Sequence, residues 1–423
     1  MASKTVWALA IFLGTFCISA FSDEDIDTPI PIDSAQIKAM FNDGDYWSAG
    51  SDGLDVLMKE PDNPELRLIV ANSLAWSGRY IDAIIQYQKL KDTSLNKESA
   101  LGLANIYRWG ARPDLAKPYY QKVLALQPRN PDATDGLMRV NREFRPKTDV
   151  TFGRKSDSNQ VSENSVLLKH NWRGDNLAHK YEVSINSSRY SFLGVYTPQT
   201  EFAIGLDFAD LMMSPKLNLS FQKDPIIKGF SLLKLKLIDE TPNLNMTLGH
   251  INWGNMAFQP QALLNGLVAQ QFGLDGSLIM YPGTISANYS YFSVSDENYV
   301  RDSNLQFAPS WRPFGDDIKY YFGLSERYAL KNIPTYWSPS KGFLSADIGF
   351  TKEWSLTEGE YAIYWQRGFY LGGEALNSFN FGFSAKRYLG NDWAASLSAG
   401  MLEHPRVGAY QSQYLSFGIE RLW

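Results

Sequence analysis

Apolar and polar side chains alternate along most of the chain from residue 147 to residue 423. In residues 378–388, Phe379, Phe381 and Phe383 fall on one face, and small or polar residues fall on the other. Residues 392–402 repeat the pattern around Trp393 and Leu397. Because successive side chains of a strand point to opposite faces, a period of two predicts strands with one apolar face. We count about sixteen such stretches.

The connections between these stretches alternate in length. After odd-numbered stretches they are mostly long, at residues 192–199, 224–229, 252–266, 295–303, 329–341 and 403–410. After even-numbered stretches they are mostly short turn signals, such as Tyr281-Pro282-Gly283. Bacterial transmembrane barrels combine an even strand count with short periplasmic turns and long outer loops. We therefore predict a transmembrane antiparallel β-barrel of about 16 strands over residues 147–423.

The aromatic share of the composition, 14%, fits the interfacial girdles of such a barrel. Ordinary packing of strand aromatics is the alternative interpretation. The girdle candidates lie near the predicted strand ends and are Trp172, Tyr181, Phe208, Trp311, Trp354, Tyr361, Trp393 and Trp423.

The first residues of the chain predict export from the cytoplasm. Lys4 precedes an apolar run over residues 6–18 and then small residues, which indicates a signal peptide over residues 1–22. Phe16 stands before Cys17 where a lipoprotein signal has a small residue, so we expect no lipid anchor. Residues 23–33, rich in acids and proline, predict a linker. The formal charge of -5 and the lack of a basic block argue against a nucleic-acid partner.

Residues 34–145 show a helical repeat. Alignment on Ala49, Ala83 and Ala116 gives spacings of 34 and 33 residues. A period near 34 with small residues at helix crossings is typical of tetratricopeptide-type helix pairs, which stack into a short solenoid. The solenoid either binds a partner or acts only as a spacer. The residues expected to pack the repeats are Gly44, Ala49, Gly78, Tyr80, Ala83, Tyr87, Gly110 and Ala116.

With both halves in place, the chain resembles the exopolysaccharide-export outer-membrane proteins, in which periplasmic tetratricopeptide repeats precede a barrel. The outer-membrane protein of the cellulose synthase operon and the poly-N-acetylglucosamine export porin are the best-known types, and YaiO-type barrels look related. The segment Tyr336-Trp337-Ser338-Pro339 before a predicted strand is similar to a Tyr-Tyr-Ser-Pro stretch of the cellulose-type barrels. A departure is the number of repeats, about three here against many more in the cellulose type.

The last strand is similar to the barrel-assembly signal of outer-membrane proteins. It ends in Trp423, with Leu415, Phe417 and Ile419 on the same face. Arg421 interrupts this face where a hydrophobic residue is usual, although an arginine near an interface can snorkel.

No catalytic or metal-binding spacing is visible. The four histidines are scattered, and none has the spacing of metal ligands. His250 raises the alternative of an outer-membrane acyl hydrolase, but no serine adjoins it along the strand. We therefore expect neither an enzyme nor a cofactor nor a bound metal.

Polar faces of the predicted strands indicate a wet lumen. The candidate lumen-lining residues are Glu182, Asn186, Asn218, Gln222, Lys234, Lys236, Asp347 and Lys386. A barrel of sixteen strands leaves an aqueous channel. Together with the resemblance, this predicts a pore that exports an exopolysaccharide across the outer membrane of a Gram-negative bacterium, with the repeats in the periplasm.

The expected contacts of this pore are outer-membrane lipid, the polysaccharide substrate and a periplasmic protein partner for the repeats, and the expected state is a monomer. The alternative is a structural or receptor barrel, plugged by the loops at residues 252–266 and 329–341. Sequence alone leaves the identity of the sugar open.

Overall fold

A computed structural model gives the fold of the protein. It describes residues 32–174, 178–192, 194–208, 211–222, 227–238, 241–254, 262, 265–311, 317–333, 335–356, 358–373, 377–403 and 410–423. The predicted signal peptide and most of the predicted linker lie outside these residues.

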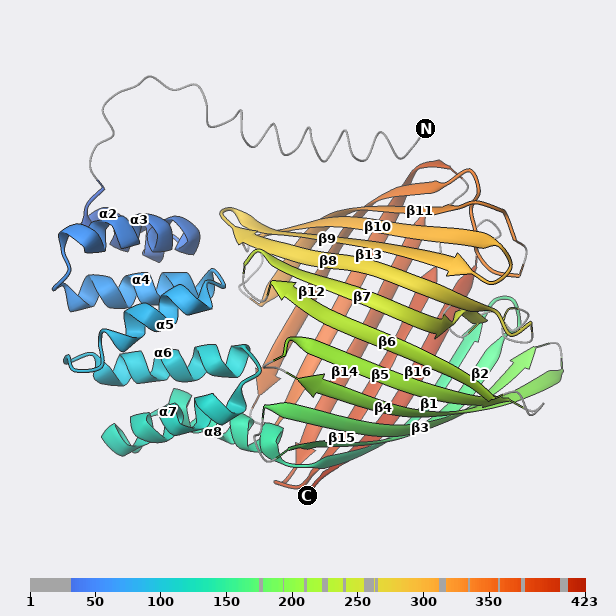
Figure 1. Cartoon of the computed structure of the whole chain (residues 1–423), viewed down its shortest axis with the longest axis horizontal. Helices are drawn as coiled ribbons and strands as arrows, with labels where there is room; N and C mark the ends of the chain where they lie inside the picture. Colours follow the sequence, from blue (N-terminus) through green and yellow to red (C-terminus); the bar gives the residue numbers. More distant parts are fainter. Residues whose placement is uncertain are drawn as a thin grey trace.

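The C-terminal part is a closed antiparallel barrel of sixteen strands (Figure 1), which confirms the predicted barrel. Each strand pairs with its neighbours in sequence, and β1 closes the cylinder against β16. The strands are β1 Lys147–Asp157, β2 Ser162–Arg173, β3 His179–Phe192, β4 Val195–Phe208, β5 Met213–Gln222, β6 Ile227–Ile238, β7 Asn243–Asn252, β8 Val268–Met280, β9 Gly283–Val294, β10 Asn298–Pro309, β11 Ile318–Ala329, β12 Phe343–Leu356, β13 Gly359–Gly373, β14 Ser378–Leu389, β15 Trp393–Glu403 and β16 Gln411–Leu422.

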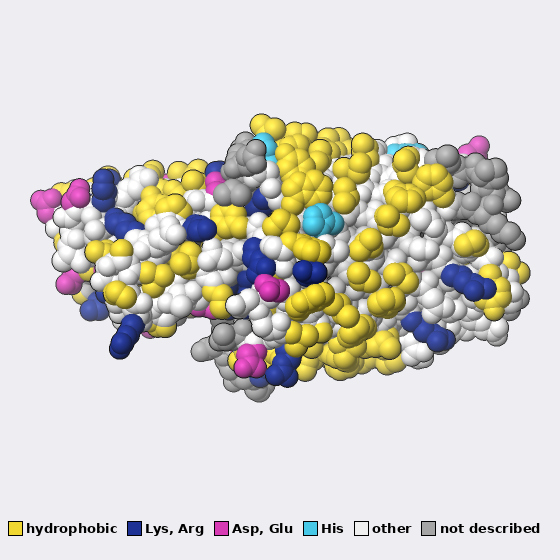
Figure 2. Space-filling model, turned by 90° about the horizontal axis from the view of Figure 1, so that it is seen from below, with side chains coloured by type: hydrophobic (Ala, Val, Ile, Leu, Met, Phe, Trp, Pro, Cys, Tyr) yellow, Lys and Arg dark blue, Asp and Glu magenta, His cyan; other side chains and the backbone are white. Residues whose placement is uncertain are grey.

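The large apolar side chains of the barrel face outward. Phe152 pairs with Phe417, which pairs with Leu397, and these side chains are 50%, 44% and 41% exposed. In Figure 2, hydrophobic side chains cover much of the barrel wall, and charged side chains lie toward its two ends. A continuous exposed apolar face of this kind is the surface that a barrel presents to hydrocarbon.

The eight girdle candidates all lie near strand ends on the side of the helices. Trp172 stacks on Tyr181 with ring centroids 5.5 Å apart, and Trp354 stacks on Tyr361 at 5.7 Å. Arg421 fits this belt because its guanidinium carbon lies 3.8 Å from the ring centroid of Trp423 and 5.3 Å from that of Trp393. Aromatic faces thus accommodate the charge that interrupts the last strand.

Seven helices precede the barrel in the described part of the chain. None of these helices is long and apolar enough to span a membrane. They run α2 Ser34–Asn42, α3 Tyr46–Lys59, α4 Pro64–Trp76, α5 Tyr80–Gln88, α6 Asn96–Trp109, α7 Pro113–Leu126 and α8 Pro131–Phe144.

The helices repeat one set of contacts. The Tyr87 hydroxyl donates to Asn72 Oδ1 at 2.6 Å, and 33 residues later the Tyr120 hydroxyl donates to Asn105 Oδ1 at 2.7 Å. Each of these rings also covers a glycine of the following helix, either Gly102 or Gly136. The chain therefore packs the same way in successive helix pairs.

The left-handed turn between paired helices also recurs, with one change from the predicted alignment. Gly44 and Gly78 adopt φ values of 81° and 79°, but in the third pair Ala111 takes this conformation, with φ 56°. Gly110 has φ -76° and is the C-cap of α6 instead. Ala111 therefore makes the turn of the third pair, one residue after Gly110. The three aligned alanines, Ala49, Ala83 and Ala116, are fully buried.

The helical stack lies against one end of the barrel (Figure 1), here called the helix-side end. A Cβ built on Gly78 would lie 3.2 Å from Ile279 Cδ1 and 3.3 Å from Thr241 Cβ, so this turn touches β8 and the connection before β7. Arg142 of α8 lies 3.9 Å above the Tyr388 ring of β14. Because β7 and β14 are seven strands apart in a sixteen-strand ring, the stack touches nearly opposite sides of the opening.

Several loops at the far end are shorter than predicted, because the strands beside them extend further. β3 continues to Phe192 and β4 begins at Val195, so residues 195–199 belong to a strand. Likewise β10 begins at Asn298 and β6 at Ile227. These residues continue the strand ladder, as in the pairing of Tyr196 with Ser191. The two longest connections that remain follow β7 and β11.

Candidate functional site

The inner wall of the barrel is the polar face of the strands. Lys386 of β14 donates to Glu420 Oε1 of β16 at 2.8 Å and so reaches across the intervening β15. The neighbouring apolar side chains of Leu397 and Phe417 point to the opposite, exposed face. Side chains that meet across an intervening strand lie on the concave side of a closed sheet, so the polar face lines the lumen.

The predicted lumen residues fall on this polar face, and several are already paired. Lys216 Nζ lies 3.9 Å from Glu182 Oε1, and Asn186 donates to Ser188 at 3.3 Å. Lys234 and Lys236 share the inner face of β6, and Asn218 of β5 pairs with Phe230 of the same strand. The side chain of Gln222 lies outside the described residues. A contact of any of them with a substrate stays a prediction.

Asp347 differs from the others because it is buried. It is 6% exposed, and its carboxylate accepts hydrogen bonds from Ser325 at 2.5 Å and from Ser345 at 3.0 Å. A carboxylate held by two hydroxyls and covered by its neighbours orders the wall of β11 and β12 rather than offering a free charge to the lumen.

A charged cavity lies between the helices and the barrel rim. It has a volume of about 250 Å³, and α6 and α8 contribute Arg108, Arg139 and Arg142 to its lining. The barrel contributes Lys147, Lys386, Tyr388, Glu360 and Glu420. Five cationic side chains therefore face two carboxylates at this entrance, and positive charge predominates. The sequence pattern does not indicate this site, since only the closed fold brings α8 to β14 and β16.

The far end of the barrel holds a hydrophobic cluster. Trp253, just after β7, and Tyr336, between β11 and β12, are 1% and 2% exposed, and their rings meet edge to face at 5.4 Å. They pack on Phe292 and Val300, whose side chains belong to the inner face of β9 and β10. The described parts of the two long loops therefore fold inward over the lumen wall.

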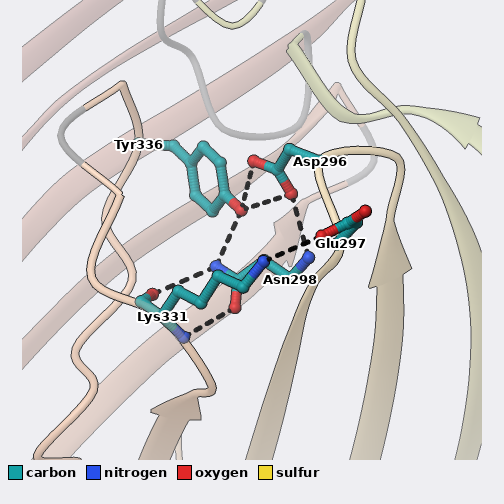
Figure 3. A network of polar contacts seen from close by, with 5 residues as sticks. All are labelled: Asp296, Glu297, Asn298, Lys331 and Tyr336. Carbon is teal, nitrogen blue, oxygen red and sulfur yellow. Dashed lines mark hydrogen bonds and ion pairs between the residues drawn. The ribbon is translucent and has the colours of Figure 1, made fainter.

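Polar contacts fix this cluster (Figure 3). The Tyr336 hydroxyl donates to Asp296 Oδ2 at 3.0 Å and accepts from Asn298 Nδ2 at 2.9 Å. Asn298 Oδ1 accepts from the Lys331 amide at 2.8 Å, and Lys331 pairs with Glu297 at 3.3 Å. Burial raises the pKa of the Tyr336 phenol well above its ordinary value. The loop after β11 is thus held to the turn between β9 and β10.

The histidine considered for hydrolysis has an amide partner. His250 Nδ1 lies 2.9 Å from Gln270 Nε2 of the neighbouring strand. Within the residues that the structure describes, no group of three or more His, Cys, Asp or Glu side chains is arranged to hold a metal ion.

Comparisons with known proteins identify the fold. No family model and no curated protein matches this sequence. A bacterial polysaccharide outer membrane secretin matches with a TM-score of 0.52 and 9% identity over 66% of this chain and 99% of that chain. CdiB from Acinetobacter baumannii matches with a TM-score of 0.41 and 7% identity over 65% of this chain and 60% of that chain. Pseudomonas aeruginosa OccK11 (OpdR) matches with a TM-score of 0.36 and 8% identity over 66% of this chain and 96% of that chain.

The match to the secretin spans 66% of this chain, and at 9% identity it defines the fold alone. The protein therefore shares the fold of a closed antiparallel β-barrel with this secretin and carries a helical stack at one end.

Proposed function

We propose that this protein is an outer-membrane pore through which an exopolysaccharide passes from the periplasm to the cell surface. The observation that carries the proposal is the position of the helical stack across one mouth of a barrel with a polar inner wall. A polymer that enters the lumen at this end must pass along the helices. A bacterial polysaccharide outer membrane secretin has a similar barrel fold, and its described role agrees with this proposal.

The helices serve in this proposal as a periplasmic platform of tetratricopeptide type. The 33-residue recurrence of the Tyr87 and Tyr120 contacts supports this assignment, because each repeat of such a protein stacks on the next in one way. The charged cavity beside α8 lies where a chain guided by the helices would meet the barrel. A periplasmic protein partner and a monomeric barrel complete the proposal.

Polymer secretion tests the export role in the native host. Deletion of the gene is expected to abolish polymer outside the cell while synthesis continues and polymer collects inside the envelope. A gene lacking residues 34–144 should restore less export than the complete gene at equal barrel abundance. Normal surface polymer in the deletion strain would rule out export as the function.

A capped barrel without transport is the second candidate. The inward packing of Trp253 and Tyr336 against Phe292 favours it, because these side chains narrow the far end. A receptor barrel closed in this way passes no steady current, whereas a pore does.

A further inference from the structure

Three tyrosines of the inner wall lie flat across glycines of neighbouring strands. A Cβ built on Gly382 would overlap Tyr364 Oη, and one on Gly400 would lie 2.6 Å from a ring carbon of Tyr414. The third pair repeats the arrangement on β11 and β12, where the ring of Tyr321 covers Gly349. Only glycine leaves room for a ring at these positions, because any Cβ would occupy the same space.

This packing leaves one face of each ring against the wall and turns the other toward the lumen. The three tyrosines are neither fully buried nor fully extended into the channel, since each is of intermediate exposure. A ring that reclines in this way is fixed in orientation and needs no reordering when a ligand lies on it. Fixed aromatic surface of this kind favours binding because little side-chain entropy is lost.

Two of these rings form a continuous strip across four strands. In register, Tyr364 of β13 pairs with Gly382, Gly382 pairs with Gly400, and Gly400 pairs with Tyr414 of β16. The two hydroxyls meet above the glycines, 2.8 Å apart. The rings therefore point toward each other and cover the wall from β13 to β16.

Uncharged polar groups border the strip toward the helix-side end. Ser398 and Ser416 hydrogen-bond to each other at 2.6 Å, and Ser384 pairs with Ser398 in register. Lys386 and Glu420, which line the entrance cavity, come next on the same strands. The wall thus leads from the charged entrance, over serine hydroxyls, to the aromatic strip.

We propose that the Tyr364–Tyr414 strip, with Tyr321 beside it, is a stacking surface for uncharged pyranose rings of the passing polymer. The apolar C–H face of a sugar suits the negative face of an aromatic ring, and the sugar hydroxyls suit the adjacent serines. Weak contacts spread along a wall permit both entry and release. The proposal names a recognition site for the proposed export function and rests on it.

Blockade of single channels by a neutral oligosaccharide tests the strip. Full-length protein in planar bilayers would be titrated with maltohexaose and with hexagalacturonate. We expect Y364A/Y414A to bind maltohexaose roughly tenfold more weakly than wild type, because the apolar sugar face loses its aromatic partner. G382A should weaken binding as well, since its Cβ displaces the Tyr364 ring without removing it.

G372A is the matched control, because a Cβ at Gly372 on the same strand as Tyr364 meets nothing within 4 Å. Maltohexaose should block the G372A channel as strongly as it blocks wild type. If wild type conducts and maltohexaose blocks every variant equally, the strip does not bind sugar, although the protein is still a pore. The same conclusion follows if hexagalacturonate blocks more tightly than maltohexaose and its blockade is unchanged in Y364A/Y414A. A wild type without current overturns the pore instead. Calorimetric titration of detergent-solubilised protein with maltohexaose then tests the strip alone, and equal affinities of wild type and Y364A/Y414A overturn it.

Discussion

Arg145 Nε donates a hydrogen bond to the carbonyl oxygen of Trp423 at 3.0 Å and so ties the segment before β1 to the last residue of the barrel. The same guanidinium donates to the Leu422 and Asn391 carbonyls at 2.9 Å each and to the Asp392 carboxylate at 2.7 Å. One side chain therefore joins the helical stack, the closing seam and the turn between β14 and β15.

Removal of this clamp should destabilise the closed barrel. We expect R145A to lower the free energy of unfolding by about 2 kcal/mol, since four hydrogen bonds are lost and the partners are partly exposed. Urea unfolding in detergent micelles measures the difference. R387A is the control at the same end, because the Arg387–Glu358 pair spans 3.5 Å and both side chains are well exposed. Equal stability of R145A and wild type would contradict the role of the clamp.

Contacts that recur in the helical stack predict where it tolerates no extra methyl group. A Cβ on Gly102 would overlap Tyr87 Cζ, so G102A should destabilise the stack by about 1–2 kcal/mol despite its better helix propensity. At Gly110 the nearest atom to a built Cβ is 3.4 Å away, and G110A should be nearly neutral. Amide hydrogen exchange of α5 and α6 would show the difference. Unchanged protection in G102A would contradict this packing.

The alternation of side chains was enough to predict the barrel, because membrane on one side and water on the other impose a period of two. The same alternation misplaced the tops of the hairpins. At the far end Arg189 lies 4.2 Å above the ring of Tyr196, and this pair continues the strands where polarity predicted a loop. In the helices, Gly44 and Gly78 adopt the left-handed conformation at the turns of the first two pairs, whereas Ala111 adopts it in the third pair, so the sequence position of a glycine did not locate that turn.

The functional contacts depend on residues distant in sequence, which explains why the pattern did not contain them. Trp253 and Tyr336 stand in separate loops and meet only because β8 to β11 bring those loops over one wall. Arg142 and Tyr388 meet only because the barrel closes beside α8. The length of the two loops at residues 252–266 and 329–341 was the signal in the sequence that pointed to this end, since it led to the alternative of a plugged barrel.

The far-end cluster of Trp253 and Tyr336, here called the cap, should loosen at alkaline pH. The pKa of Tyr336 is raised by burial, so the contribution of its phenol to cap stability is full below the unfolded pKa of about 10 and falls as pH rises above it. Asp296, Arg327 and the Lys331–Glu297 pair are the charged groups near this phenol. We expect proteolysis of the loop after β11 to be constant from pH 7 to 9 and to increase above pH 10.

Tyr336→Phe separates the phenol from the general effect of alkali. It leaves Asp296 and Asn298 without the hydroxyl, which should lower the free energy of opening the loop at pH 7 by about 1–2 kcal/mol. The increase in proteolysis above pH 10 should therefore be smaller than in wild type. If proteolysis of the variant rises above pH 10 as much as that of wild type, a group other than the Tyr336 phenol controls the opening of the loop.

Lumenal lysines should set the ion preference of the channel. K234Q/K236Q removes two positive charges from the inner face of β6, so the reversal potential in a KCl gradient should shift toward cation selectivity. Lys352 lies on the outer face of β12 beside Asp317 at 3.0 Å, and K352Q should leave the potential unchanged. An equal shift of the reversal potential in K234Q/K236Q and K352Q would contradict the assignment of Lys234 and Lys236 to the inner face.

Single-channel recording of the purified full-length protein tests most directly whether the barrel is a water-filled pore. We expect steady conductance through the wild type and a larger conductance once residues 331–341 are deleted, because that segment carries Tyr336 over the inner wall. A wild type and a loop-deleted variant that both fold in the bilayer and both pass no current would contradict the account.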